Sequence, residues 1–410
     1  MGVTIASVTS VAAVLTLLWL AAVTIIVVAY RELWRRVWRE PVLRFPVLIV
    51  ESDDWGAGPA SQAAALRELA DILAGHRDGS GRMPVLCLAL VLAVPDGQAM
   101  RESGPYRRLE LDHSRFADIL VALRDGAARG VFSLQLHGLE HYWPPTLMAS
   151  RDERVHAWLI HSDAAATETL PAHLQSRWVD ASRLPSTAHD PAAILAAVAD
   201  EVRAFERIVG VAPKVVVPPT FVWTRGVEAA WAAQGIECIV TPGWRYTQRD
   251  TLGQAAGDEG PIVNGDRFAD GVYLARCDYF EPLRGRDAVH ALAALQRATR
   301  QGRPCLLENH RDNFIGDRAA CLRSLQEVDK LFRDAVASHV DLRFLSSQEL
   351  GRALRERDPR WLFTGVRHKL PYLWERVRHS GRAWRLMRLT GMSVLGNLAV
   401  AWTAKVKETG

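Results

Sequence analysis

The chain has 410 residues, and 49% of them are hydrophobic and 23% charged, which is the ordinary usage of a globular protein. These proportions exclude collagen-like, low-complexity and disordered chains, and the length suits one large domain or two ordinary ones. The formal net charge of +4 is uneven: residues 31–45 carry +3 and residues 360–410 carry +8, which leaves −7 for residues 46–359. An acidic central body argues against nucleic acid as a partner.

Residues 1–30 contain no charged side chain, and the run from Val11 to Tyr30 is long enough to cross a bilayer. We expect a transmembrane helix at residues 1–30, because a cleavable signal peptide would have a basic start and a shorter apolar core. A basic juxtamembrane neck follows at residues 31–45. By the positive-inside rule, its arginines place the rest of this single-pass inner or plasma membrane protein in the cytoplasm. Scattered cysteines agree with a reducing compartment, although a periplasmic or extracellular protein with buried thiols would show the same pattern.

Short apolar runs alternate with helical patterns from residue 46 onward. The predicted strands are Pro46–Glu51, Val85–Val94, Val131–Leu136, Lys214–Val217, Cys238–Val240, Val272–Cys277, Pro304–Glu308 and Leu342–Leu345. The predicted helices are Gln62–Ala74, Ser114–Ala128, Pro191–Val209, Val227–Gln234, Asp287–Arg300 and Arg318–Ala337. This alternation predicts parallel βαβ units in an α/β domain, and the number of units favours a barrel over an open sheet. The irregular stretch Tyr142–Asp190 directly follows a predicted strand end.

Polar side chains follow three of the predicted strands. Asp53 and Asp54 come after the first strand, His137 and His141 after the third, and His310 after the seventh. The mouth of a parallel barrel is built from such strand ends, so we expect these side chains to lie close together. An Asp pair or a His-x-x-x-His spacing is a weak signal on its own, but imidazoles with a carboxylate are ligands that suit zinc.

These motifs resemble those of the polysaccharide deacetylases of carbohydrate esterase family four, the NodB-type deacetylases. The resemblance covers roughly residues 46–350. The segment Ser52–Gly56 is similar to the family's first motif, His137 and His141 to its second, and His310 to its late catalytic histidine. The resemblance implies a distorted (β/α)7–8 barrel of the NodB type at residues 46–355.

The resemblance also implies the roles of the site residues. Asp54, His137 and His141 would hold a divalent metal, with Zn²⁺ as the expected ion, while Asp53 would be the general base and His310 the general acid. The segment Val216–Trp223 is similar to the third motif, Arg-x-Pro-Tyr, but lacks its Arg, so the group that orients Asp53 is left open. Further contacts to substrate are expected from residues beside the motifs: Trp55, Trp143, Thr220, Phe221, Trp223, Arg311 and Asn313.

Residues 356–410 are rich in arginine and tryptophan. Basic and aromatic side chains on one helical stretch predict a membrane-surface arm that lies on an anionic leaflet. The basic residues that carry this expectation are Arg367, Lys369, Arg376, Arg378, Arg382, Arg385 and Arg388. Leu389–Trp402 is only weakly polar but too short to span a bilayer comfortably.

The expected function is that of a metal-dependent hydrolase that removes an N-acyl group, acetyl or formyl, from an amino sugar. A chain tied to the bilayer at both ends suits a lipid-linked glycan as substrate. Two alternatives stay open. A glycosyltransferase would use an Asp-rich strand end to hold a nucleotide sugar through its cation, but it would leave the histidines without a role. A non-catalytic carbohydrate-binding relative of the deacetylases would explain the missing third-motif Arg.

Overall fold

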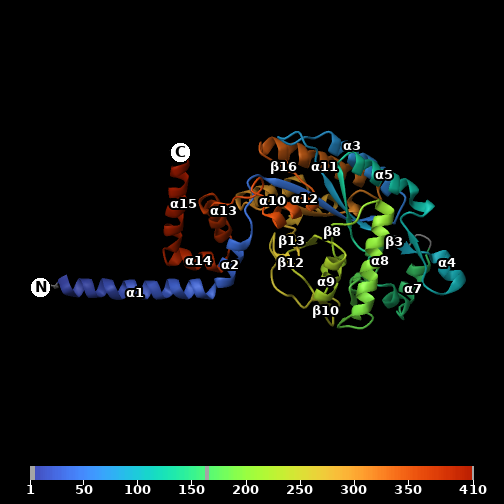
Figure 1. Cartoon of the computed structure of the whole chain (residues 1–410), viewed down its shortest axis with the longest axis horizontal. Helices are drawn as coiled ribbons and strands as arrows, with labels where there is room; N and C mark the ends of the chain where they lie inside the picture. Colours follow the sequence, from blue (N-terminus) through green and yellow to red (C-terminus); the bar gives the residue numbers. More distant parts are fainter. Residues whose placement is uncertain (1–4, 162–165, 409–410) are drawn as a thin grey trace. The chain divides into compact units, whose positions relative to one another are not determined.

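The computed structural model describes residues 5–161 and 166–408, and the chain divides into two compact units (Figure 1). The smaller unit consists of Met1–Arg44, Arg300–Gly302 and Pro359–Gly410, so it combines the two ends of the chain. The larger unit consists of Phe45–Thr299 and Arg303–Asp358.

A long sheet forms the centre of the larger unit. Its strands run in the order β12-β13-β9-β8-β5-β2-β1-β15-β14, and β16 pairs with β1. The pairs are parallel except for β12 with β13. The bounds of these strands are β1 (Val47–Gly56), β2 (Leu86–Val91), β5 (Phe132–Leu136), β8 (Val215–Val216), β9 (Cys238–Thr241), β12 (Arg267–Phe268), β13 (Gly271–Ala275), β14 (Asp278–Tyr279), β15 (Cys305–His310) and β16 (Arg343–Phe344).

The sheet closes on itself through one extended stretch of chain. Only Arg276 and Cys277 separate β13, which pairs with β9, from β14, which pairs with β15. The amide of Arg276 donates to the carbonyl of Thr241 (2.8 Å), whereas the amide of Cys277 donates to the carbonyl of Leu306 (2.9 Å). The ring therefore runs β1, β2, β5, β8, β9, β13–β14, β15 and back to β1, which confirms the predicted distorted β/α barrel.

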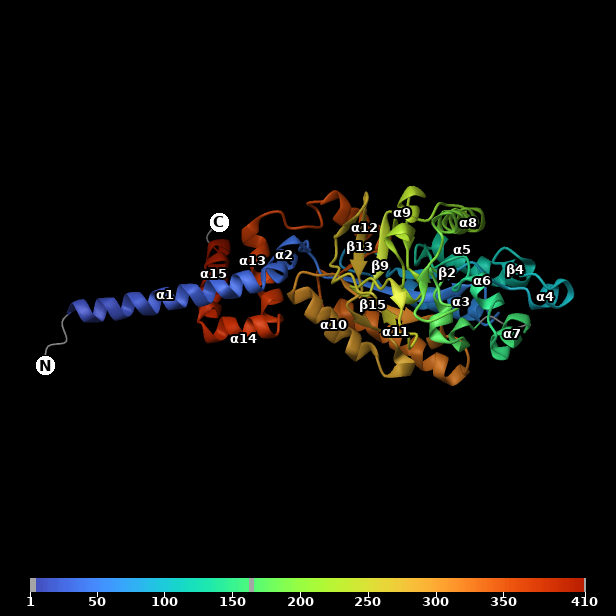
Figure 2. The ribbon, with the colours of Figure 1, turned by 90° about the horizontal axis from the view of Figure 1, so that it is seen from below.

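Helices surround this barrel (Figures 1 and 2). Their bounds are α3 (Gln62–Ala74), α5 (Ala117–Ala128), α8 (Pro191–Val209), α9 (Arg225–Ala233), α10 (Ala288–Arg300), α11 (Arg318–Ser338) and α12 (Ser347–Glu356). Helix α8 is an example of how the sequence specifies these helices. The side chain of Asp190 caps the helix by accepting from the amides of Ala192 and Ala193, Pro191 supplies a favourable first residue, and Gly210 ends the helix in the left-handed region (φ 94°). Its buried side chains recur at helical spacing, and each large apolar one contributes about 1.5–3 kcal/mol by burial.

The irregular stretch between β5 and α8 folds as an insertion. Its side chains, including Tyr142, Leu147 and Leu159, form a small hydrophobic cluster together with Met100. Its elements are α6 (Pro144–Met148), α7 (Glu153–Ile160), η2 (Thr167–Thr169), η3 (Ala172–Gln175), β6 (Val179–Asp180) and β7 (Thr187–Ala188). The remaining short elements of the larger unit are β3 (Ala93–Pro95), α4 (Gly97–Ser103), β4 (Arg108–Glu110), η1 (Ser114–Phe116), η4 (Pro219–Phe221), β10 (Gln248–Arg249), β11 (Ala255–Ala256), η5 (Pro282–Arg284) and η6 (Arg311–Asn313).

The smaller unit is helical. Its elements are α1 (Ile5–Ala29), α2 (Arg31–Arg39), α13 (Val366–Arg378), α14 (Arg382–Leu389) and α15 (Met392–Glu408). Residues Ser10–Ala29 of α1 are long and apolar enough to cross a membrane, as an anchor or as a signal sequence. Arg376 departs from the expected basic arm: its buried guanidinium donates to the carbonyls of Glu40 (2.8 Å) and Pro41 (2.8 Å), so it does not face lipid.

Candidate active site

A bulge in β1 presents the two adjacent carboxylates. The pairing of β1 with β2 shifts register between Ser52 and Trp55, so that Asp53 and Asp54 lie in the irregular part of the strand. Asp54 has a φ of 70°, a left-handed conformation that Asp tolerates better than most residues. A bulge re-aims the side chains within it, and as a result the two carboxylates contact different partners.

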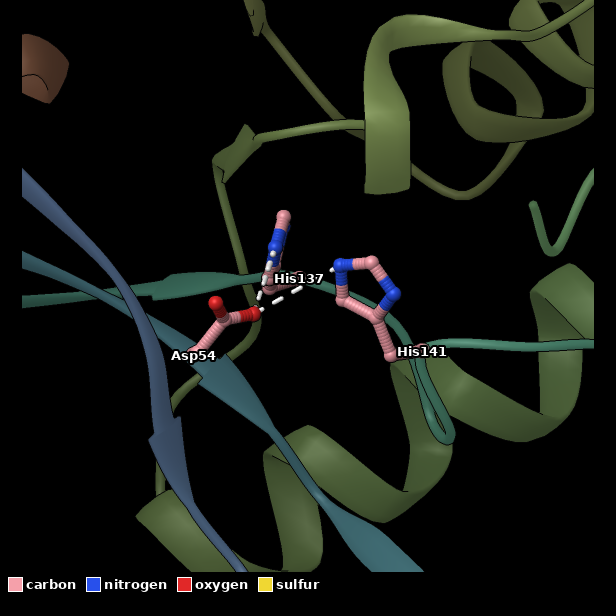
Figure 3. A group of neighbouring side chains, drawn as sticks. All are labelled: Asp54, His137 and His141. Carbon is pink, nitrogen blue, oxygen red and sulfur yellow. Dashed lines mark ion pairs between the residues drawn. The ribbon is translucent and has the colours of Figure 1, made fainter. Parts of the chain in front are cut away.

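A tight loop after β5 brings the two histidines together. Gly138 has a φ of 108°, and a Cβ at this position would lie 2.7 Å from the carbonyl oxygen of Glu140, so the turn requires glycine. The imidazoles of His137 and His141 have their centroids 4.9 Å apart. Their Nε2 atoms lie 3.4 and 3.5 Å from Oδ1 of Asp54 (Figure 3).

The far nitrogen of each imidazole is held by the backbone. Nδ1 of His137 lies 2.7 Å from the carbonyl oxygen of Val217, and Nδ1 of His141 lies 3.1 Å from that of Gln175. Because a carbonyl only accepts, Nδ1 must carry the proton, which leaves the Nε2 lone pairs facing Asp54. Burial, reinforced by the charge of His137, lowers the pKa of His141 to about 4, so this imidazole is neutral at physiological pH.

The three side chains fit a divalent cation. Their ligand atoms all lie within 4.8 Å of one another, and all three residues are buried. Within the described residues, Oδ1 of Asp54 is buried without a hydrogen-bond partner, which is costly for a carboxylate unless a positive charge compensates it. One carboxylate and two imidazoles are a donor set that binds zinc and similar ions.

Arg276 orients Asp53. Its guanidinium donates from Nη1 and Nη2 to the two oxygens of Asp53, both at 2.7 Å, and from Nε to Glu51 (3.1 Å). Glu308 lies 3.4 Å from the same guanidinium. Burial raises the pKa of Asp53, but the charge and hydrogen bonds of Arg276 overcome it and lower that pKa. Asp53 is therefore an ionised carboxylate, and the arginine that the third motif lacks is supplied by the junction of β13 and β14.

His310 is held by a second carboxylate. It ends β15, where it is the strand neighbour of Asp53, and its Nδ1 lies 2.6 Å from Oε1 of Glu281. The other oxygen of Glu281 accepts a hydrogen bond from Asn313. Burial lowers the pKa of His310, but its hydrogen bond to Glu281 and the charges of Asp53 and Asp54 raise that pKa to about 10. His310 is thus an imidazolium at neutral pH.

The two carboxylates of β1 and the three histidines line one cavity of about 310 Å³. The sequence-predicted residues that line it are Asp53, Asp54, His137, His141, Thr220, Phe221 and His310. Thr220 and Phe221 both have a φ of 56°, and two consecutive non-glycine residues in the left-handed region store backbone strain. Such strain is typical of functional loops.

Five other predicted residues do not line the cavity. Trp55 is fully buried, donates to Oγ of Ser52 (2.8 Å) and lies against Phe314, and Trp223 is also fully buried, so neither ring is available to stack on a ligand. Trp143 instead stacks on His189, with ring centroids 4.1 Å apart. The other two act through neighbours. Arg311 is buried 3.3 Å from Glu168 in the cavity wall, and Asn313 holds Glu281.

The sequence reasoning missed Arg276, Glu281 and Arg177. Arg276 lies near the end of the predicted strand Val272–Cys277, so its place after an apolar run was a usable signal. No local pattern marks Glu281. Arg177, in the insertion, is buried and donates to the side chain (2.9 Å) and backbone of Glu140 and to the carbonyl of Tyr142 (3.1 Å). Arg177 therefore fixes the loop that carries both histidines.

Comparisons with known proteins give only distant similarity. No family model matches the chain, and no curated protein matches it. Among solved structures, a 4-alpha-glucanotransferase from Thermococcus litoralis is 13% identical, with a TM-score of 0.39 over 76% of this chain. The chain spans 40% of the length of that protein.

Two family 4 esterases are also similar to the chain. An acetyl xylan esterase from Clostridium thermocellum is 10% identical, with a TM-score of 0.35 over 74% of this chain and 89% of its own length. A carbohydrate esterase from Streptomyces lividans is 12% identical, with a TM-score of 0.32 over 75% of this chain and 96% of its own length. Identities and TM-scores this low do not assign a function. A functional proposal must therefore rest on the geometry of the site.

Proposed function

We propose that the chain is a metal-dependent hydrolase that removes an N-acyl group, acetyl or formyl, from an amino sugar. The observation that supports this best is the convergence of Asp54, His137 and His141 with an ionised Asp53 and a protonated His310 on one cavity. A glycosyltransferase has no use for this acid and base pair. Arg276 replaces the missing third-motif arginine, which favours a working enzyme over a non-catalytic binding protein.

The proposed mechanism gives each residue a separate task. When held by Asp54, His137 and His141, a divalent cation, Zn²⁺ in our proposal, supplies Lewis acidity that acidifies a water molecule and polarises the acyl oxygen. Asp53, kept ionised by Arg276, accepts the proton of the attacking water. His310 donates its proton to the amide nitrogen as the carbon–nitrogen bond breaks, because Glu281 fixes Nδ1 and leaves Nε2 as the donor.

The strained loop supplies the remaining contact. The amide of Phe221 already donates to the carbonyl of Pro218 (3.0 Å), so the backbone donor to the developing oxyanion in this proposal is Thr220. The ring of Phe221 lies over Arg276, and its centroid is 5.4 Å from Cζ of the guanidinium. In this position the ring shields the ion pair of Arg276 and Asp53 from water.

The substrate in this proposal is a lipid-linked glycan. The support is α1, whose length and composition suit a membrane anchor, together with the basic neck that follows it and favours a cytoplasmic catalytic unit. An enzyme anchored in this way acts on sugars that are themselves held at the bilayer.

The test measures acetate or formate released from N-acylated lipid-linked amino sugars by the full-length protein. We expect release that a chelator abolishes and zinc restores. Asp53→Asn should eliminate turnover while metal analysis still finds the ion, whereas His137→Ala should lose the ion. His290→Gln, which changes a histidine outside the cavity, is the matched control and should retain both. Full activity of Asp53→Asn, or release that is insensitive to chelation, would contradict the proposal.

A further inference from the structure

Helix α15 carries an exposed apolar stripe. The side chains of Val394, Leu395, Leu398 and Trp402 are 57%, 56%, 62% and 58% exposed, and their spacing puts them on one face of the helix. We call these four residues the apolar stripe. No charged residue occurs between Leu389 and Trp402, so the stripe belongs to a segment that is uncharged all round.

The side chain of Asn397, in the same segment, forms hydrogen bonds with α13. Oδ1 of Asn397 accepts from Nε1 of Trp374 (2.8 Å) and from Arg378 (3.3 Å), both on α13. Gly396 lets the ring of Trp374 approach closely, since a Cβ there would lie 2.0 Å from it. Helix α15 is therefore fixed to α13 on one side. Within the apolar stripe, Trp402 also contacts α13, where the guanidinium of Arg367 lies 5.1 Å from its ring centroid, whereas Val394, Leu395 and Leu398 are exposed.

A hydrogen bond ties the start of α15 to the middle of α1. Nε1 of Trp19 donates to the carbonyl oxygen of Thr390 (2.6 Å), at the turn between α14 and α15. Trp19 lies ten residues before the end of α1 at Ala29, which is about 15 Å along the helix axis. A carbonyl at a helix end has no partner within its helix, and in lipid it needs one from protein. The bond therefore holds the turn before α15 against the apolar part of α1.

Helix α14 and the segment that follows it differ in charge. Arg382, Arg385 and Arg388 are exposed on α14, whereas the segment that follows has none. A helix that lies flat among headgroups carries charge along its polar face. Helix α14 meets that description, and α15 as far as Trp402 does not.

We propose that the apolar stripe of α15 is immersed in the acyl chains of the leaflet next to the neck. The chain is then held in the bilayer by α1 and by α15, not by a single span and a surface arm. This inference rests on the membrane anchor of the proposed function, and the experiment separates the two.

The test uses the full-length protein in phosphatidylcholine vesicles, with and without phosphatidylglycerol. A hydrophobic diazirine that forms a carbene within the bilayer is activated, and tryptic peptides are analysed by mass spectrometry. Cleavage after Arg31 and Arg388 isolates α1 and Leu389–Lys405 on separate peptides. We expect both to be labelled at least about tenfold above Asp250–Arg267, in either lipid mixture. That control peptide holds Leu252, which is 80% exposed in the larger unit.

The outcomes are distinct. Labelled α1 with Leu389–Lys405 at background overturns the inference and leaves the anchor intact. Background labelling of both peptides overturns the anchor as well. Labelling of Leu389–Lys405 only with anionic lipid returns α15 to the surface, and labelling that falls as the protein-to-lipid ratio rises assigns the stripe to a second copy of the chain. Either result contradicts immersion.

A pair of variants controls for folding. Leu395→Glu with Leu398→Glu should reduce labelling of Leu389–Lys405 to background while the α1 peptide keeps its labelling. The matched double change to Ile should keep the labelling of both peptides. In each variant, zinc binding by the larger unit reports that the protein is folded. Undiminished labelling of the Glu variant would overturn the inference.

Discussion

Replacing Glu281 by Gln tests the assignment of His310 as the acid. The change keeps the shape of the side chain and removes the charge that lies 2.6 Å from Nδ1 of His310. A carboxylate hydrogen-bonded to a buried imidazolium raises its pKa by about 1–3 units, which is about 1.4–4 kcal/mol. The pKa of His310 is raised to about 10. We expect Glu281→Gln to lower that pKa by about 1–3 units.

The sign of the stability effect follows from the direction of the shift. Because folding raises the pKa of His310 from 6.5 to about 10, its contribution to stability is fully present below pH 6.5 and is lost as the pH rises towards 10. Glu281→Gln should therefore be less stable than the parent protein below pH 6.5, and the two should converge near pH 10. The alkaline limb of the activity profile should move to lower pH, since the acid must be protonated.

The assay is an NMR titration of labelled histidines, with His310→Gln to assign the resonance, and denaturant unfolding at both ends of this pH range. Asp278→Asn is the matched control. It removes a carboxylate 2.7 Å from His290, another histidine–carboxylate pair outside the cavity, and should leave the titration of His310 unchanged. An unaltered His310 titration in Glu281→Gln would refute the reasoning.

Three further substitutions test the groups that hold the site. Arg276→Met should abolish turnover and lower the free energy of unfolding by about 3–5 kcal/mol, because it strands buried carboxylates, whereas Arg318→Met at an exposed pair should cost at most about 1 kcal/mol. Equal costs in denaturant unfolding would contradict this. Arg177→Met should weaken zinc binding about 10–100-fold in a chelator competition by loosening the histidine loop, and unchanged affinity would exclude that role. Gly138→Ala should weaken zinc binding because its Cβ meets a carbonyl, while Gly130→Ala, also at positive φ but in open space, should leave zinc binding unchanged.

The strands and the reacting residues could be predicted because their signals are local. An apolar run of five or six residues followed by a polar side chain is visible in the sequence, and parallel strands bring such ends together, as they do for Asp53, His137 and His310. The bulge that gives Asp53 and Asp54 different partners could not be predicted. The sequence pattern suggested that the strand ends at Glu51, whereas β1 continues to Gly56 and contains the bulge.

The supporting residues could not be predicted because their partners are distant in the chain. Arg276 and Asp53 are 223 positions apart, and only the closure of the barrel makes them neighbours. The error over Trp55 and Trp223 has a related cause. Proximity to a motif does not say which side of the backbone a ring occupies, and both rings lie in the core.

The junction of β13 and β14 couples the completeness of the barrel to the readiness of the base. The backbone amide of Arg276 bonds to the carbonyl of Thr241 at the point where the ring closes. The side chain of the same residue forms the ion pair with Asp53. A chain whose ring is still open at this seam has Asp53 without its guanidinium. In the proposed mechanism, the base therefore lacks the group that keeps it ionised until β13 has paired with β9 and β14 with β15.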